Sequence, residues 1–222
     1  MPFLRLNLGR TPYLGVFCLV TDRVALFPRH VKLDEEELEE KLGVPVVRGE
    51  VMGSPLLGVF LAGNSRGIVA PHLLGEEEER SLREEGVEVH RIPGKLTALG
   101  NLLLVNDRGG LASPSLPPKT VEEVSSALGI PLERGTISGL KTVGSAGVAT
   151  DKGALLHPDA TEEEVERVRR ALRVPVSKGT ACDGEKYVGI CVAANSHGFL
   201  AGGPTTGAEL GAIERALYHP EG

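Results

Sequence analysis

Three cysteines are the side chains of this 222-residue sequence best suited to covalent chemistry: Cys18, Cys182 and Cys191. Cys191 lies in an apolar run typical of a buried strand, where a thiol is small and inert, whereas Cys182 lies in a loop and is expected to be exposed. A thiol acts as a nucleophile when a base stands beside it in space, which spacing along the chain does not establish. The odd count and the lack of a C-x-x-C spacing disfavour structural zinc and a disulfide framework, and favour a reducing cytoplasm.

The other chemistry-bearing residues follow no catalytic or metal-binding motif. Six histidines are scattered along the chain: His30, His72, His90, His157, His197 and His219. None has the H-x-H or H-E-x-x-H spacing of metal ligands, so each is expected at a turn or on the surface. The sequence also lacks a phosphate-binding loop, a dinucleotide fingerprint and a G-x-S-x-G element. We therefore predict no catalytic residue, no metal and no cofactor.

Charge and hydropathy limit the function classes further. With 24 Lys and Arg against 30 Asp and Glu, the net charge is −6, which disfavours a protein that only coats nucleic acid. Acidic runs at 35–40 and 76–79 are expected to be solvated helix faces; the alternative is an acidic surface for a basic partner. No apolar stretch reaches 18 residues and the N-terminus has no signal-peptide pattern, so no membrane contact is expected.

A repeat of about 43 residues organises the elements that must position these side chains. An apolar-Gly pair opens each copy, at steps of 43, 42, 44 and 45 residues: Leu14-Gly15, Leu57-Gly58, Leu99-Gly100, Val143-Gly144 and Val188-Gly189. An apolar run, a polar turn and a proline follow in every copy, and a Gly-Val-Pro-like anchor follows in the first four. Because these sequence features recur at the same spacing along the whole chain, they are strong evidence for an internal repeat.

Each copy is predicted to form a strand, a turn, a strand, a helix and a final strand. The apolar runs after the pairs are short and bounded by turn residues, which favours buried strands at 16–20, 59–62, 102–105, 146–149 and 190–194. Four of the turns end in glycine, where we expect a positive φ, whereas Val24 in the first copy predicts another turn shape. Final strands are predicted at 44–48, 87–92, 131–133 and 175–177.

Capping boxes predict where the helices begin. The paired residues are Thr120 and Glu123, Thr161 and Glu164, Thr206 and Glu209, and, as an acidic variant, Asp34 and Glu37. Apolar residues after these boxes recur on one helical face. The fifth copy ends after its helix, so residues 1–8 are predicted to supply its missing strand.

Five units that cannot each bury a face alone share one core when they are arranged in a circle. The sequence therefore predicts one α/β domain over residues 1–222, a five-fold pseudo-symmetric α/β propeller closed by the N-terminal strand. Its repeats span about 14–56, 57–98, 99–142, 143–187 and 188–222. A linear solenoid is the alternative, but it would need polar capping repeats, and the first and last units look ordinary.

The segments 64–71 and 96–101, followed by Asn106-Asp107 and Pro114, resemble the translation initiation factor 6 family. The resemblance covers essentially the whole chain and is that of the shorter, archaeal type. It implies a pentein fold, five ββαβ-type units around an axis. It also implies a non-enzymatic factor that binds the large ribosomal subunit, blocks its association with the small subunit and is linked to large-subunit biogenesis. We expect a cytoplasmic monomer without a small-molecule substrate.

The resemblance also implies where the ribosome is bound. Family members dock on a ribosomal protein near the sarcin–ricin loop, with ribosomal RNA nearby, and the net charge of −6 fits a basic protein partner. An asparagine at the ribosome-facing surface of the family matches Asn101. The predicted ribosome-binding set, extended by adjacency and pseudo-symmetry, is Asn101, Gly100, Leu99, Leu57, Leu14 and Val143. The alternative is that residues 99–101 only shape a tight strand entry.

Enzymes that modify guanidino compounds share the pentein fold and are the alternative function. They use a cysteine nucleophile in a glycine-rich loop near the C-terminus, with a histidine and acidic residues on other units. The matching loop here, 202–207, has the glycines but no cysteine, and a threonine hydroxyl without a base is a poor substitute. This departure favours a binding factor over an enzyme.

Overall fold

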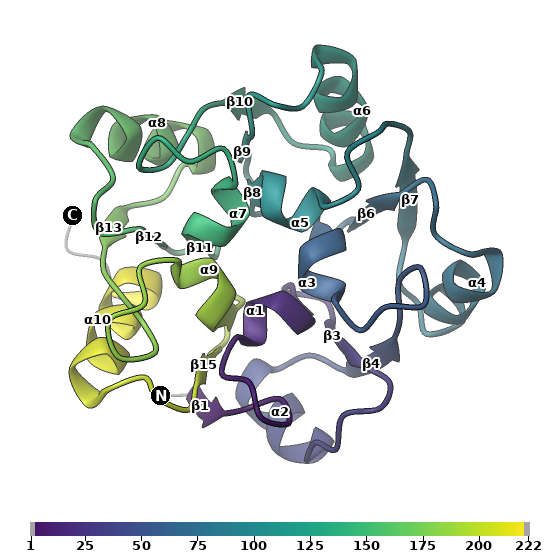
Figure 1. The fold of residues 1–222 in the computed structure, drawn as a ribbon, viewed down its shortest axis with the longest axis horizontal. Helices are drawn as coiled ribbons and strands as arrows, with labels where there is room; N and C mark the ends of the chain where they lie inside the picture. Colours follow the sequence, from purple (N-terminus) through teal and green to yellow (C-terminus); the bar gives the residue numbers. More distant parts are fainter. Residues whose placement is uncertain (1–2, 220–222) are drawn as a thin grey trace.

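A computed structural model describes residues 3–219 and has five small α/β units that follow one another around a central axis (Figure 1). Each unit contains a one-turn helix, a β-hairpin, a longer helix and a third strand. The one-turn helices lie nearest the axis, and the longer helices form the periphery (Figure 1).

The five units have the following bounds. Unit 1 contains α1 (Leu14–Phe17), β2 (Leu19–Val20), β3 (Ala25–Pro28), α2 (Glu35–Leu42) and β4 (Val46–Gly49). Unit 2 contains α3 (Leu57–Phe60), β5 (Ala62–Asn64), β6 (Gly67–Pro71), α4 (Glu76–Glu84) and β7 (Val89–Ile92). Unit 3 contains α5 (Leu99–Leu102), β8 (Leu103–Val105), β9 (Gly110–Ala112), α6 (Pro118–Leu128) and β10 (Leu132–Arg134). Unit 4 contains α7 (Val143–Ala146), β11 (Gly147–Ala149), β12 (Ala154–Leu156), α8 (Glu162–Leu172) and β13 (Val176–Lys178). Unit 5 contains α9 (Val188–Cys191), β14 (Val192–Ala194), β15 (Phe199–Gly202), α10 (Gly207–Tyr218) and, from the chain start, β1 (Phe3–Leu6).

Each unit has its own three-stranded sheet. The two hairpin strands pair antiparallel, and the third strand pairs parallel with the second hairpin strand, as β2, β3 and β4 do. In unit 5 the third strand is β1, which runs parallel to β15 from Phe3 opposite Phe199 to Leu6 opposite Gly202. This confirms that the N-terminal segment completes the fifth sheet, although residues 1–2 and 220–222 lie outside the described residues. The predicted final strands are confirmed to within two residues at either end.

The predicted first strand of each copy begins too early, by one to three residues. Each pair begins a helix of one turn, closed in unit 1 by the N–H of Cys18, which donates to the carbonyl of Leu14 over 2.9 Å. The strand starts only after this turn, for example at Leu103 in unit 3. Periodicity does not separate a short buried helix from a short buried strand, because both are continuously apolar.

The turn glycines also differ from expectation. The glycines that end the four polar turns are absent from the described residues with positive φ. Two of them are required by a close approach instead: a Cβ on Gly109 would overlap the carbonyl oxygen of Ala171, and one on Gly153 would overlap that of Ala216. These two turns therefore pack against the end of the next unit's outer helix, where only glycine leaves room.

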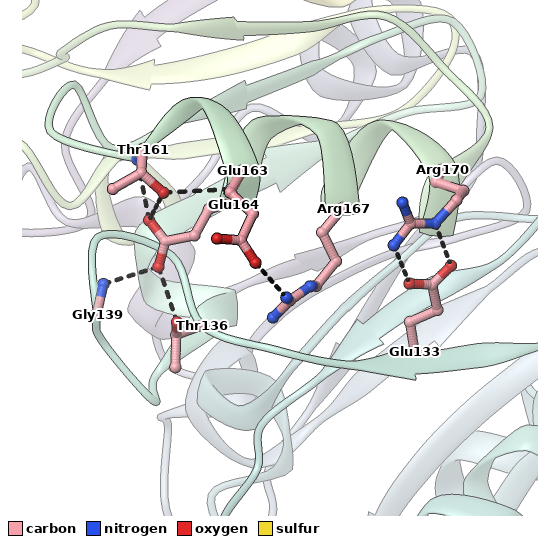
Figure 2. Close-up of polar contacts among 8 residues, drawn as sticks. All are labelled: Glu133, Thr136, Gly139, Thr161, Glu163, Glu164, Arg167 and Arg170. Atoms are coloured by element: carbon pink, nitrogen blue, oxygen red, sulfur yellow. Dashed lines mark hydrogen bonds and ion pairs between the residues drawn. The ribbon is translucent and has the colours of Figure 1, made fainter.

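Three of the predicted helix caps are confirmed. Thr161 accepts a hydrogen bond from the backbone N–H of Glu164, whose carboxylate accepts the N–H of Thr161 (Figure 2). Thr206 and Glu209 form the same reciprocal pair at the start of α10. The carboxylate of Asp34 accepts the N–H three residues further on and caps α2.

The capping box at Thr120 is wrong. Helix α6 begins two residues earlier, at Pro118, because a proline in the first turn has its φ already set for a helix and sacrifices no hydrogen bond. Thr120 therefore lies buried inside the helix. The start of α4 was not predicted, since its N-cap is Gly75, whose N–H donates to the Glu78 carboxylate over 2.8 Å.

The hydrophobic core lies between neighbouring units. Leu26 of unit 1 packs in one cluster with Leu57 and Leu82 of unit 2, and equivalent clusters follow around the ring. Leu14 of unit 1 shares a cluster with Leu200 of unit 5, so the last interface closes the circle. No unit therefore completes its core alone. Among residues 3–219 there is no helix of the length and apolarity needed to cross a bilayer.

Candidate functional site

Five glycines, which we call the glycine ring, hold the one-turn helices together around the axis. The ring consists of Gly15, Gly58, Gly100, Gly144 and Gly189, one from each of α1, α3, α5, α7 and α9 (Figure 1). A Cβ added to any member would overlap the carbonyl oxygen of the ring glycine in the preceding unit, and Gly15 in this way meets Gly189. The helices therefore touch through bare backbone. The ring glycines and the first hairpin strands line an axial cavity of about 110 Å³.

Four of the predicted ribosome-binding residues lie in the interior. The side chains of Leu14, Leu57, Leu99 and Val143 are 0–1% exposed, in the clusters between units. A buried side chain offers no surface to a partner, so these four residues can act on binding only by positioning the one-turn helices, and the ribosome-binding role of the set stays a prediction. Their apolar type is explained by the core, where they orient the one-turn helices.

Asn101 and Gly100 are half-buried and lie on the side of the molecule that carries the one-turn helices, which we call the ring face. The side-chain oxygen Oδ1 of Asn101 accepts a hydrogen bond from Oγ of Ser145 over 3.1 Å, which links α5 to α7. This bond orients the amide, so that its Nδ2 group keeps two donors for a partner. Sequence reasoning did not single out Ser145, although it occupies the same position in its unit as Asn101.

The position after the ring glycine breaks the five-fold symmetry of this face. Asn101 and Ser145 occupy it in units 3 and 4, whereas the other units carry half-buried apolar residues, Val16, Val59 and Ile190. A partner could bind a perfectly five-fold symmetric ring in five equivalent orientations. Because only one polar pair is present, one of these orientations differs from the other four.

At the other end of the axis, the polar turns join each unit to the next. Oδ1 of Asn106 accepts the N–H groups of Arg108 and Gly109, both over 3.0 Å, and so shapes its own turn. Its Nδ2 donates to the carbonyls of Thr150 and Leu172 in unit 4, both over 3.0 Å. Asn106 therefore also binds unit 3 to unit 4.

Three aspartates of these turns lie close together. The carboxylates of Asp22, Asp107 and Asp151 have oxygen atoms within 4.8 Å of one another, a spacing that a cation can bridge. Each also accepts a backbone N–H of a neighbouring unit; Ser196, for instance, donates to Asp22 over 2.6 Å and Asp107 to Asp151 over 2.9 Å. Burial and the neighbouring carboxylates raise the pKa of Asp151. The hydrogen bonds between units therefore explain why the three aspartates lie together: they hold neighbouring units to one another.

The cysteines form no nucleophile–base pair. Cys191 is buried as predicted, whereas Cys182, expected to be exposed, is half-buried. The hydrogen bonds of the Cys182 thiol involve the carbonyl of Pro12 and the hydroxyl of Thr205, neither of which is a base. His157 is occupied elsewhere: its Nδ1 accepts the N–H of Asp159 over 3.2 Å.

The fold and the site define the class of protein: a ring of five α/β units in which a hydrogen-bonded polar pair, Asn101 and Ser145, distinguishes one side of the glycine ring.

The model of the eIF-6 family matches residues 3–216. Translation initiation factor 6 from Pyrococcus horikoshii is 43% identical over 222 residues, which cover 96% of this chain and 97% of the relative. The protein of the same name from Methanococcoides burtonii is 38% identical over 218 residues, with the same coverage. That from Archaeoglobus fulgidus is 60% identical over 123 residues, 55% of this chain and 57% of the relative. The chain belongs to the eIF-6 family.

Proposed function

We propose that this protein is a translation initiation factor that binds the large ribosomal subunit and prevents its association with the small subunit. The observation that carries the proposal is the family match over residues 3–216, together with archaeal relatives that bear the name translation initiation factor 6. A role in large-subunit biogenesis belongs to the same proposal, since a factor bound to the free subunit accompanies its maturation.

We further propose the form in which it works. The five units form one pentein domain, a five-bladed α/β propeller, that acts as a cytoplasmic monomer. It works by occupying a surface and turns over no guanidino compound or other small-molecule substrate. The arrangement of Cys182, whose thiol has no base among its partners, supports this view.

The ring face that carries the one-turn helices is the docking surface in this proposal. Asn101 lies there beside Gly100, and its Oδ1 is already occupied by Ser145. The free amide donors therefore suit a carbonyl or carboxylate acceptor of the partner. Half-buried apolar residues on the neighbouring helices, such as Val16 and Val59, suit the apolar centre of a protein interface.

The partner is a ribosomal protein near the sarcin–ricin loop, with ribosomal RNA nearby. The peripheral helices α2 and α4 begin with the acidic residues Glu35, Glu36 and Glu37, and Glu76 to Glu79. Carboxylates at these helix starts are favoured by the helix dipole and give the rim a negative potential. Such a rim attracts a basic ribosomal protein and is repelled by RNA phosphates, which favours a protein as the main contact.

Asn101→Ala should weaken binding to the large subunit by about 1–3 kcal/mol, roughly 5- to 150-fold, because it removes a polar contact from an interface centre. Its free energy of unfolding should fall by less than about 1 kcal/mol, since one internal hydrogen bond is lost. Fluorescence titration with purified subunits and thermal unfolding measure the two quantities.

Ser145→Ala is the matched control, because it removes the same internal hydrogen bond and keeps the Asn101 amide. It should share the loss of stability and retain most of the binding. If both variants lose stability and the folded fraction of each binds normally, Asn101 is a structural residue and does not belong to the interface.

Co-sedimentation tests the proposed function itself. The protein is mixed with separated archaeal ribosomal subunits and centrifuged through sucrose, and each pellet is assayed for it. We expect it with the large subunit alone, at close to one copy per subunit. Equal recovery with both subunits, or recovery with neither, would overturn the proposal.

A further inference from the structure

The fold brings two cysteines of unit 5 together. Cys182 lies in the loop closed by the bridge between Ala181 and Glu185, and Cys191 is the last residue of α9. Cys182 packs against the hydrophobic cluster of unit 5 that contains Cys191, and each thiol perturbs the pKa of the other. Both are free thiols; Cys191 is buried, and Cys182 is half-buried. Nothing in the proposed ribosomal role uses this pair.

The two thiols have unequal acidity. The hydrogen bond from Cys191 and, more weakly, the one from Thr205 lower the pKa of Cys182 to about 7, against burial and the charges of Glu209 and Glu185. The same bond and burial raise the pKa of Cys191. Near neutral pH, Cys182 therefore holds a large share of thiolate, while Cys191 remains a thiol that donates to it.

The surroundings of Cys182 hold its sulfur in place and leave it room. The Oγ1 of Thr205 accepts the backbone N–H of Cys182 over 3.1 Å and donates to its Sγ over 3.8 Å. The Sγ also lies 3.8 Å from the carbonyl oxygen of Pro12, and a Cβ at Gly202 would overlap the sulfur. Glycine at position 202 is thus what makes space for the thiol.

The backbone of this loop is bent in an unusual way. Cys182 and Asp183 have φ values of 50° and 63°, in the left-handed region that side chains disfavour, and Gly184 follows at 94°. The carboxylate of Glu209 accepts the N–H groups of Asp183 and Gly184 over 3.0 and 2.8 Å and stabilises the bend. The bend carries Cys182 to a position beside Cys191, nine residues away in sequence.

We propose that Cys182 and Cys191 are a redox-responsive dithiol that a peroxide converts into an intramolecular disulfide. The Cys182 thiolate attacks one oxygen of the peroxide; the O–O bond breaks, water leaves after protonation, and the sulfur becomes a sulfenic acid. The Cys191 thiol then loses its proton and attacks the Cys182 sulfur, so that the S–O bond breaks and a second water leaves. One peroxide is reduced and two thiols are oxidised to one disulfide.

Cys18 provides an internal control. It is buried, its thiol donates to the carbonyl of Leu14 over 3.1 Å, and burial raises its pKa to about 12. It lies in another unit and has no thiol partner in the hydrogen bonds that the structure records for it. Alkylation and oxidation at neutral pH should therefore leave Cys18 untouched.

The test uses the full-length protein, reduced and then treated with hydrogen peroxide at neutral pH. Intact mass should fall by about 2 Da, dithiothreitol should restore it, and peptide mapping should join Cys182 to Cys191. Before oxidation, iodoacetamide should label Cys182 at least about tenfold faster than Cys18. The variant Cys191→Ala should instead stop at a sulfenic acid on Cys182, with a gain of about 16 Da that dimedone traps.

Two results would overturn the proposal. One is a wild-type protein that keeps its mass and its alkylable thiols under peroxide. The other is oxygen addition at Cys182 without a disulfide, which would mean that Cys191 does not reach the oxidised sulfur. Both readings come from the wild-type chain, so the decision does not depend on the folding of a variant.

Discussion

Gly144→Ala should lower the free energy of unfolding by about 3 kcal/mol or more, the largest effect expected of any single methyl group in this protein. The added Cβ would overlap the carbonyl oxygen of Gly100 and would lie 2.6 Å from that of Leu103. Both overlapping atoms belong to the backbone of a neighbouring unit, so the overlap cannot be relieved by a change of side-chain rotamer. Because the ring is closed, a displaced α7 also disturbs its contact with Gly189 on the other side. Urea-induced unfolding followed by circular dichroism measures the change.

Gly207→Ala is the matched control, at the first residue of α10. A Cβ there meets no atom within 4 Å, and the position has no positive φ. Alanine should leave stability unchanged or raise it by up to about 1 kcal/mol, since it restricts the unfolded chain. Equal destabilisation by the two variants would contradict the role of the glycine ring.

The second large effect is expected at Glu164, whose carboxylate joins the start of α8 to the loop before unit 4. It accepts hydrogen bonds from the Oγ1 of Thr136 over 2.7 Å and from the backbone N–H groups of Gly139 and Thr161 over 2.9 and 3.0 Å (Figure 2). The backbone N–H of Ser138 also donates to it, over 2.8 Å. The residue is only 8% exposed. Glu164→Gln turns an amide group toward these donors and should cost about 2–3 kcal/mol at neutral pH.

The same carboxylate makes stability depend on pH. Burial alone would raise the pKa of Glu164, but the hydrogen bonds from Gly139, Thr161, Thr136 and Ser138 outweigh it and lower the pKa to about 2. The folded-state value lies below the unfolded value of about 4.3, so the stabilisation is complete above about pH 5 and is lost as the pH falls toward 2. In Glu164→Gln, unfolding measured between pH 7 and 2 should show a smaller loss on the acid side.

Glu163→Gln is the control for both measurements. This neighbour forms an ion pair with Arg167 over 3.0 Å, and its side chain is 83% exposed (Figure 2). An exposed pair on one helix contributes about 0.5 kcal/mol or less. If Glu163→Gln lowers the free energy of unfolding as much as Glu164→Gln does, the buried carboxylate has no special role. The same follows if Glu164→Gln loses as much stability between pH 5 and 2 as the wild type.

The repeat made most of the fold predictable from sequence. The spacing of the apolar-Gly pairs located the five units, and the reciprocal boxes at Thr161 and Thr206 located two helix starts. The one-turn helices could not be predicted, because a four-residue apolar segment has no periodicity to read. The role of Gly109 and Gly153 could not be predicted, because a close approach between units leaves no trace in local sequence.

The candidate site was less predictable, since pseudo-symmetry does not say which residues of a repeat face outward. An apolar residue in front of the ring glycine in all five units was itself a signal of the core, as Leu14 and Leu99 illustrate. Asn101 entered through a family resemblance, and its bond to Ser145 joins residues 44 positions apart. The contact between Cys182 and Cys191 likewise depends on a bent loop that sequence does not reveal.

A subunit-joining experiment tests directly whether the protein keeps the two ribosomal subunits apart. Purified archaeal large subunits are incubated with the protein, small subunits are added, and the formation of whole ribosomes is followed by light scattering. The account predicts that joining falls in proportion to the share of large subunits that carry the protein, and that Asn101→Ala requires roughly 5- to 150-fold more protein for the same effect. Full joining by large subunits that still hold the protein would contradict it.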